Sequence, residues 1–285
     1  MLYSVNQEIE NMINILESTL KSTINGKCAI ALAGSYAKGN ADKSSDIDFF
    51  MFVENPKSYE ERVKIIQSIA DKDKPVWVSE SFDESAWGGT MDFFYQGIPV
   101  ETTVRTIERM DAVINDCMEG KFEIIPALWT TNGYYTYIYL SEISFIKPID
   151  DPHGIIDGYK DKIKVYPKKL QTAILDCFFD RSNMWLDNFH YISAIEREDI
   201  MFTGSIVKAT VLDMVQIVFA LNEAYFCGDK KLELQLSKLS YCPHKLLQNV
   251  EFLMSAPKDK NKLAEQRELL IAIRDRLQYK ISEIE

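Results

Sequence analysis

The sequence contains few of the residues that hold transition metals or form disulfide frameworks. It has five cysteines and three histidines in 285 residues, and no two cysteines are spaced as a CxxC pair. The odd number and wide scatter of the cysteines exclude the paired framework of small secreted proteins. We therefore expect reduced thiols, a cytoplasmic location and no zinc site.

Basic residues are scarce near the N-terminus, and uninterrupted apolar runs are scarce throughout the chain. The first twenty residues carry acidic side chains where a secretory signal needs a basic start, so we expect no signal peptide. The most apolar stretch, residues 206–221, is broken by Lys208 and Asp213, which predicts a buried helix and no membrane partner. Without repeats or low-complexity segments, the sequence is typical of a globular protein.

An excess of positive charge is also missing. Acidic residues outnumber basic ones by 43 to 32, and the net charge is −11. Residues 1–150 hold 23 acidic and 13 basic side chains, so a balance of −10 lies there and −1 in the remainder. Such a surface repels a phosphate backbone and attracts a small cation, so we expect no long nucleic acid as a partner. Solubility alone would explain the same acidity.

The hydrophobic pattern divides the chain into a mixed first half and a helical second half. Helical spacing of apolar residues predicts helices over residues 5–25 and 59–72. Strand patterns cover residues 27–34, 46–53, 74–80, 90–97 and 98–106, with a hairpin turn at QGIP between the last two. Residues 150–159 are rich in turn formers and predict a linker or crossover, and the long segments 168–197, 200–226 and 261–285 are helical. We expect an α+β chain, with a domain at residues 1–150 that holds a mixed sheet of about five strands flanked by helices, followed by a helical bundle domain at residues 151–285.

One short stretch, AGSYAKGNADKSSDIDFFMF at residues 33–52, combines a glycine turn, a polar loop and two aspartates in an apolar strand. Because side chains alternate between the faces of a strand, Asp46 and Asp48 point one way while Ile47 and Phe49 point into the core. Two carboxylates in an apolar segment are costly unless a cation lies between them. Their spacing of about 7 Å along a strand predicts a shared divalent metal ion.

Three further residues complete this predicted site. Glu101 lies in the apolar strand PVETTV and is the natural third acid. Gly34 permits a close approach of the backbone to a ligand, and Ser35 offers a hydroxyl and an amide to phosphate oxygens. Since Mg²⁺ prefers a few carboxylates together with water and substrate phosphates, the set predicts Mg²⁺ and a phosphorylated substrate.

Gly34-Ser35, a ten-residue spacer and Asp46-Ile47-Asp48 together resemble the signature of the polymerase-beta-like nucleotidyltransferase superfamily. The fuller form, with Gly39 in the loop and Ser45 before the aspartates, resembles the bacterial aminoglycoside and lincosamide nucleotidyltransferases. Those enzymes also have this length and a nucleotidyltransferase domain followed by a helical bundle. The segment ALNEAYFCGDKKLE at residues 220–233 is similar to helical-domain stretches of uncharacterised bacterial members.

The resemblance implies an enzyme that binds ATP or another nucleoside triphosphate with Mg²⁺. It would pass the nucleoside monophosphate, AMP in the case of ATP, to a hydroxyl of a small molecule and release pyrophosphate. Asp46 and Asp48 would hold the metal, and Gly34 and Ser35 would hold the phosphates. Glu101 would ligate metal, deprotonate the acceptor hydroxyl, or do both.

Other polar residues have two readings each. Lys230 or Lys231 would reach the triphosphate from the helical domain, or would cap a helix. Ser45 would bond a metal-ligating aspartate or only form a turn. Lys38 and Lys43 would touch phosphate or remain solvated. Two further acids and four tyrosines would line an acceptor pocket, or would be solvated acids and a strand or packing face: Glu80, Asp92, Tyr134, Tyr135, Tyr137 and Tyr139.

The acceptor stays open at this stage. An aminoglycoside or lincosamide suits the acidic N-terminal half. A protein side chain, as in toxin–antitoxin nucleotidyltransferases, is an alternative, although those chains are shorter. RNA tailing conflicts with the net charge, and an inactive nucleotide-binding module conflicts with the intact aspartate pair. Apolar surface on the helical domain would support a homodimer.

Overall fold

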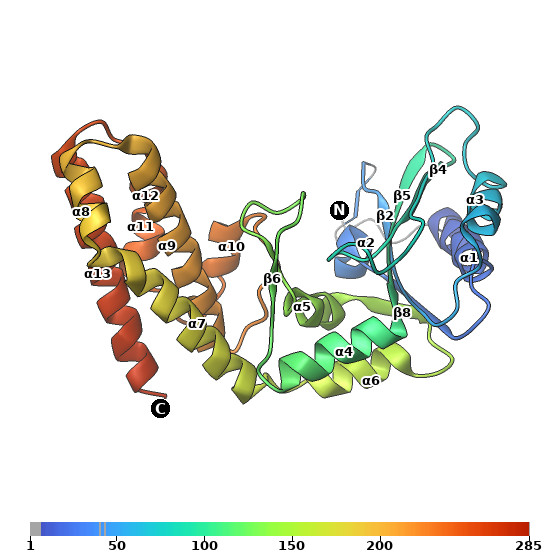
Figure 1. Ribbon diagram of the computed structural model, residues 1–285. Coiled ribbons are helices and arrows are strands. Elements are labelled where there is room, and N and C mark those ends of the chain that lie inside the picture. Colours follow the sequence, from blue (N-terminus) through green and yellow to red (C-terminus); the bar gives the residue numbers. More distant parts are fainter. Residues whose placement is uncertain (1–6, 40, 43, 285) are drawn as a thin grey trace. The chain divides into compact units, whose positions relative to one another are not determined.

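The chain forms two compact units in the computed structural model, which describes residues 7–39, 41, 42 and 44–284 (Figure 1). Unit 1 comprises Met1–Asp116 and Tyr134–Val165, and unit 2 comprises Cys117–Gly133 and Tyr166–Glu285. The α+β class is confirmed, because a mixed sheet with helices is followed by the helical region α7–α13. The division at residue 150 stays a prediction, since compact packing alone does not define an independently folding domain.

Unit 1 is built on a six-stranded sheet with strand order β3-β4-β5-β2-β1-β8. β2 and β5 are parallel, and the other neighbours are antiparallel. The strands are β1 (Cys28–Leu32), β2 (Ile47–Val53), β3 (Trp77–Val78), β4 (Met91–Tyr95), β5 (Ile98–Thr106) and β8 (Lys147–Asp150). The sequence predicted all of them except β8, whose residues KPID contain a proline that is tolerated at a sheet edge.

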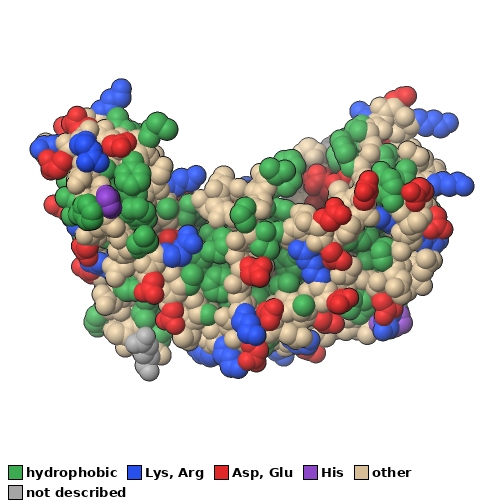
Figure 2. Space-filling model, viewed as in Figure 1, with side chains coloured by type: hydrophobic (Ala, Val, Ile, Leu, Met, Phe, Trp, Pro, Cys, Tyr) green, Lys and Arg blue, Asp and Glu red, His purple; other side chains and the backbone are tan. Residues whose placement is uncertain are grey.

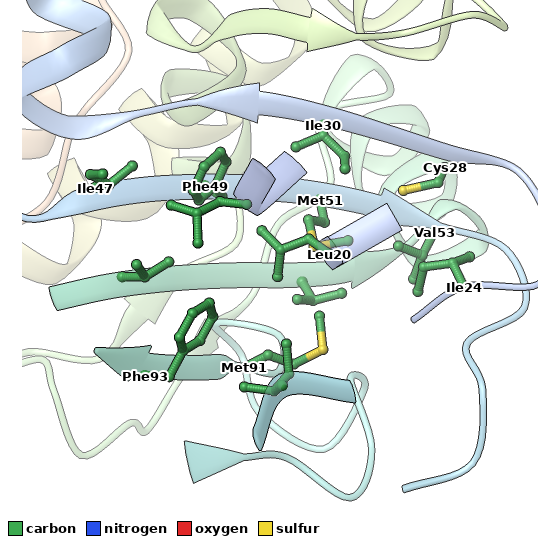
Figure 3. Close-up of a cluster of buried hydrophobic side chains, with 14 of the residues drawn as sticks. Leu20, Ile24, Cys28, Ile30, Ile47, Phe49, Met51, Val53, Met91 and Phe93 are labelled. Atoms are coloured by element: carbon green, nitrogen blue, oxygen red, sulfur yellow. The ribbon is translucent and has the colours of Figure 1, made fainter. Parts of the chain in front are cut away.

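The hydrophobic core of unit 1 lies between this sheet and two helices, α1 (Gln7–Lys21) and α3 (Tyr59–Gln67) (Figure 1). Ile47, Phe49 and Met51 of β2 are at most 1% exposed, as the predicted alternation requires. Figure 3 shows them in one cluster with Leu20 of α1 and Ile30 of β1. Of the helix predicted over residues 5–25, residues 5 and 6 lie outside the described part of the chain.

The predicted hairpin joins β4 and β5 through Gln96 and Gly97. Their φ angles are 52° and 81°, and two positive φ values in a two-residue loop define the turn that matches strand twist best. The Asp71 carboxylate accepts hydrogen bonds from the amides of Gln96 (3.0 Å) and Gly97 (2.7 Å). This end of the hairpin is therefore held by a side chain from outside the sheet.

The remaining elements of unit 1 include a helix in the segment that the sequence predicts as a linker or crossover. They are α2 (Gly34–Lys38), α4 (Ile107–Met118, whose last two residues are grouped with unit 2), β7 (Tyr134–Tyr135), α5 (Ile138–Phe145) and α6 (Ile155–Ile163). Residues 150–159 do not link the two units, because they lie inside unit 1, where β8 ends and α6 begins. The helix starts there because the Asp151 carboxylate accepts the amides of Ile155 (2.7 Å) and Ile156 (2.8 Å).

Unit 2 contains the short strand β6 (Ile124–Ile125) and a helical bundle around α9 (Ile200–Leu221) (Figure 1). The other helices are α7 (Lys168–Leu186), α8 (Phe189–Glu196), α10 (Leu232–Leu236), α11 (His244–Gln248), α12 (Val250–Met254) and α13 (Lys260–Ser282). By length and composition α9 would be able to cross a membrane, but 67% of its apolar window is buried inside the protein. Its Asp213 is 5% exposed and pairs with Arg181 of α7 at 3.1 Å. The prediction of a buried helix at 206–221 is confirmed.

Candidate functional site

The two parallel strands at the centre of the sheet bring the three predicted acids together. Asp46 immediately precedes β2, Asp48 lies within it, and the register pairs Asp48 with Glu101 of β5. One carboxylate oxygen from each of the three acids lies within 4.8 Å of the others. Asp46 and Asp48 are half-buried and Glu101 is exposed. Oxygen ligands at this spacing would hold a divalent cation.

Gly34 begins α2 directly beside Asp48. Its φ is +53°, and a Cβ added there would overlap the Asp48 carboxylate and come within 2.6 Å of its carbon atom. The neighbouring Ala33 amide donates a hydrogen bond to the Asp48 carbonyl at 2.9 Å. Glycine is therefore required twice, for the backbone conformation and for the space that the carboxylate fills. The residues after Gly34 form a short helix, where the sequence predicted a polar loop.

Ser35, the next residue, supports a ligand at this turn. Its hydroxyl oxygen is buried and has no hydrogen-bond partner among the described residues. A buried hydroxyl left in this state costs about 1–3 kcal/mol, which a phosphate oxygen of a ligand would recover. The residues present thus fit the nucleotide phosphates that the sequence predicts for this position.

Ser45 forms part of a turn in the described structure. Its hydroxyl accepts the Asp42 amide at 2.9 Å, and its own amide donates to the Asp42 carbonyl at 3.1 Å. Asp42 Oδ1 in turn accepts the amide of Ser44 at 2.8 Å. These bonds correspond to the turn-forming reading of Ser45. Lys43 lies outside the described residues.

Burial and neighbouring charges both act on Asp48. Burial raises the pKa of Asp48 to about 7, and the nearby carboxylates of Asp46 and Glu101 contribute to the rise, while Lys38 opposes it. Without a cation, this environment therefore favours the protonated form of Asp48. A divalent cation at this position would displace that proton and remove the repulsion among the carboxylates.

Asp92 is a fourth acid, for which the sequence predicts either a solvated side chain or a place in an acceptor pocket. It lies in β4, its Oδ1 accepts the Thr102 amide at 2.7 Å, and its charge adds to the rise in the pKa of Asp48. Burial also raises the pKa of Asp92 itself. The sequence contains a pattern that would have indicated Asp92 as a further acid of the site. Met91-Asp92-Phe93 repeats the apolar–acid–apolar pattern of Ile47-Asp48-Phe49.

Two lysines have contacts of their own. The Lys38 ammonium lies 4.9 Å from the centre of the Phe145 ring, so it is placed over an aromatic face. Lys230 is an exposed residue of unit 2 between α9 and α10, and its carbonyl accepts the Gln235 side-chain amide at 2.8 Å. A role of Lys230 toward a triphosphate stays a prediction.

The four tyrosines of GYYTYIYL pack in the interior and do not form an alternating strand. Each of Tyr134, Tyr135, Tyr137 and Tyr139 is at most 2% exposed. Two of them contact the fully buried guanidinium of Arg105 on β5, which lies 3.7 Å from the Tyr139 ring centre and donates to the Tyr134 hydroxyl at 3.2 Å. The same guanidinium forms an ion pair with Glu142 at 2.5 Å. This region supports the strand that carries Glu101.

Comparisons with known proteins agree with this geometry. Residues 9–89 match the family model described as a nucleotidyltransferase domain, which covers the glycine turn and both aspartates and ends before Glu101. The fold of the chain is similar to that of a nucleotidyltransferase-like protein from Exiguobacterium sibiricum, with 9% identity and a TM-score of 0.50. That match covers 97% of this chain and 76% of the other. No curated protein matches the chain. Residues 9–89, which lie within unit 1, are thus similar to a nucleotidyltransferase domain.

Proposed function

We propose that this protein transfers a nucleoside monophosphate from a nucleoside triphosphate, with AMP from ATP as the first case, to a hydroxyl group of a small molecule. The observation that carries the proposal is the convergence of Asp46, Asp48 and Glu101 beside the Gly34-Ser35 turn. The reaction forms a bond from the acceptor oxygen to the α-phosphorus. It breaks the bond from that phosphorus to the bridging oxygen, and pyrophosphate leaves.

The residues have distinct roles in this proposal. Asp46 and Asp48 would hold Mg²⁺, which when bound neutralises phosphate charge during the displacement. Ser35 would orient the phosphates through its hydroxyl and amide. Glu101 is exposed whereas the two aspartates are half-buried, which favours Glu101 as the carboxylate that accepts the proton of the acceptor hydroxyl.

The acceptor that we propose is a cationic small molecule. Asp92 adds a further carboxylate beside the triad, and Figure 2 shows several acidic side chains on the visible face of unit 1. Such a surface raises the local concentration of cationic ligands. Aminoglycosides and lincosamides are therefore the first compounds to test, in a cytoplasmic enzyme supplied with ATP and Mg²⁺.

The test uses each of the four nucleoside triphosphates labelled at the α-phosphate, with Mg²⁺, the purified protein and a panel of both drug classes. We expect label to move onto one acceptor, and Asp48→Asn to reduce the rate at least about 100-fold. Glu80→Gln changes an exposed acid of the same unit, whose carbonyl bonds Arg62, and is expected to leave the rate unchanged.

Two results would contradict parts of this proposal. Label that appears only on proteins of an added lysate would replace the small-molecule acceptor with a protein side chain. Nucleotide binding that is unaltered by Asp48→Asn, without transfer to any acceptor, would indicate a binding module without catalysis.

A further inference from the structure

The ladder between β4 and β5 is interrupted beside Glu101. Phe93 pairs with Val100 on one side of the interruption, and Gly89 pairs with Val104 on the other, in the same register. Between these pairs, Met91 and Thr102 stand opposite one another, and a regular antiparallel ladder would join them through their own amides and carbonyls.

Two side chains replace the backbone partners at this point. The Thr102 amide donates to Oδ1 of Asp92 at 2.7 Å, and the Met91 amide donates to the Thr102 hydroxyl at 2.6 Å. Both bonds are short and engage half-buried or buried groups. Together they form a clasp, by which we mean the side-chain bonds of Asp92 and Thr102 across β4 and β5.

The clasp acts on the backbone next to the third acid. Thr102 follows Glu101 directly, so the bond from Asp92 fixes the peptide that carries the Glu101 side chain. On its other side Glu101 is fixed by its register with Asp48 of β2. Asp92 therefore bonds the backbone next to Glu101 from the β4 side.

We propose that Asp92 is a positioning residue of the metal site, which holds Glu101 against Asp46 and Asp48 through its hydrogen bond to the Thr102 amide. This inference rests on the proposed function, because it assumes that the three acids bind a divalent cation. According to this inference, Asp92 promotes cation binding through its hydrogen bond to the Thr102 amide and not through its negative charge.

Two conservative variants separate the bond from the charge. Asp92→Asn keeps an oxygen acceptor at the same distance and removes the charge, whereas Asp92→Glu keeps the charge and displaces the acceptor. The matched controls are Asp71→Asn and Asp71→Glu, because Asp71 caps the opposite end of the same hairpin through the amides of Gln96 and Gly97. The readout is Mn²⁺ binding, measured by electron paramagnetic resonance of the free ion without nucleotide.

We expect Asp92→Glu to weaken Mn²⁺ binding about tenfold, a typical effect of losing a bond that orients a metal ligand. We expect Asp92→Asn to stay within about threefold of the wild type, and both Asp71 variants to bind as the wild type does. Thr102→Val removes the other half of the clasp and is expected to weaken binding in the same direction. It serves as the test if Asp92→Glu fails to fold.

The contrary outcomes are distinct. If Asp92→Asn binds Mn²⁺ as weakly as Asp92→Glu does, the negative charge of Asp92 is what promotes binding, and the proposed positioning role is wrong. If Asp71→Glu weakens Mn²⁺ binding to the same extent, Mn²⁺ binding depends on the whole hairpin and Asp92 has no special role. Binding unchanged in both Asp92→Glu and Thr102→Val would also overturn the inference. A wild-type protein that binds no Mn²⁺ would overturn the proposed metal site together with this inference.

Discussion

The Asp48 carboxyl group combines burial with three neighbouring negative charges. Its pKa is raised from 3.8 in an unperturbed chain to about 7 in the folded protein. Between these values the folded state binds more protons than the unfolded state, so the free energy of unfolding falls as pH rises. The contribution of Asp48 is complete below about pH 4 and lost above about pH 7.

We predict that this linkage is visible in the wild type and absent in Asp48→Asn. From about pH 5 to about pH 8, the wild type should lose on the order of 2 kcal/mol relative to the variant, after allowance for solvent screening. Urea denaturation of both proteins at the two pH values, without divalent cations, measures the difference. Added Mg²⁺ should reduce the loss in the wild type only. If the free energy of unfolding changes with pH in the same way in both proteins, the raised pKa is wrongly assigned to Asp48.

A second prediction concerns the glycine beside this carboxyl group. Gly34→Ala places a methyl group where the Asp48 carboxylate lies, at a φ of +53°. We expect a loss of about 1–3 kcal/mol in the free energy of unfolding, together with loss of divalent-cation binding. Gly39→Ala is the matched control, since its φ is +70° and a Cβ there meets no atom within 4 Å.

The control should lose stability from backbone strain alone and bind the cation normally. Thermal unfolding and Mn²⁺ titration distinguish the two effects. A Gly34→Ala protein with wild-type cation affinity would show that Asp48 can move aside.

At the scale of single elements, β5 is anchored by a buried ion pair four residues beyond Glu101. The Arg105 guanidinium is fully buried, pairs with Glu142 and donates to the Trp87 carbonyl at 2.9 Å. Removing one partner of a buried pair leaves an uncompensated charge, which costs about 3–5 kcal/mol.

We predict a loss of about this size for Glu142→Ala, measured by urea denaturation. Glu223→Ala removes the partner of Lys168 in an exposed ion pair and should cost less than about 1 kcal/mol. If both variants lose a similarly small amount of stability, the Arg105 guanidinium must bond to water or to another group once Glu142 is removed.

The elements that sequence patterns predicted are those with regular periodicity. The alternation in β2 and the hairpin turn before β5 were readable because each depends on neighbouring residues. Asp46, Asp48 and Glu101 were readable as acids in apolar surroundings, but their approach to within 4.8 Å depends on the parallel register. β8 and the start of α6 were not readable, because an edge position and a side-chain cap from Asp151 outweigh local propensity there. The role of Asp92 was missed because it depends on a strand two places along the sheet from β2.

At the scale of the whole molecule, α6 belongs to unit 1, although it lies beyond residue 150. Ile156, Tyr159 and Ile163 of this helix are at most 4% exposed, and the Tyr159 ring contacts Phe52 of β2 edge-to-face at 5.7 Å. Burial of three such side chains contributes about 5–8 kcal/mol, which is comparable to the stability of a whole domain.

We therefore predict that a fragment of residues 1–165 unfolds cooperatively, whereas a fragment of residues 1–150 does not. Circular dichroism during thermal unfolding of both fragments measures the difference. A shorter fragment that melts as sharply and at the same temperature as the longer one would place the folding boundary at residue 150.

The contact between Gly34 and Asp48 limits how this chain can change over evolutionary time. The Asp48 carboxylate already occupies the space that any side chain at position 34 would need. A side chain gained at position 34 would therefore require a shorter residue at position 48, and that change would remove the carboxylate from the site. Descendants that diversify in acceptor are thus expected to retain this pair and to vary in the segments around it.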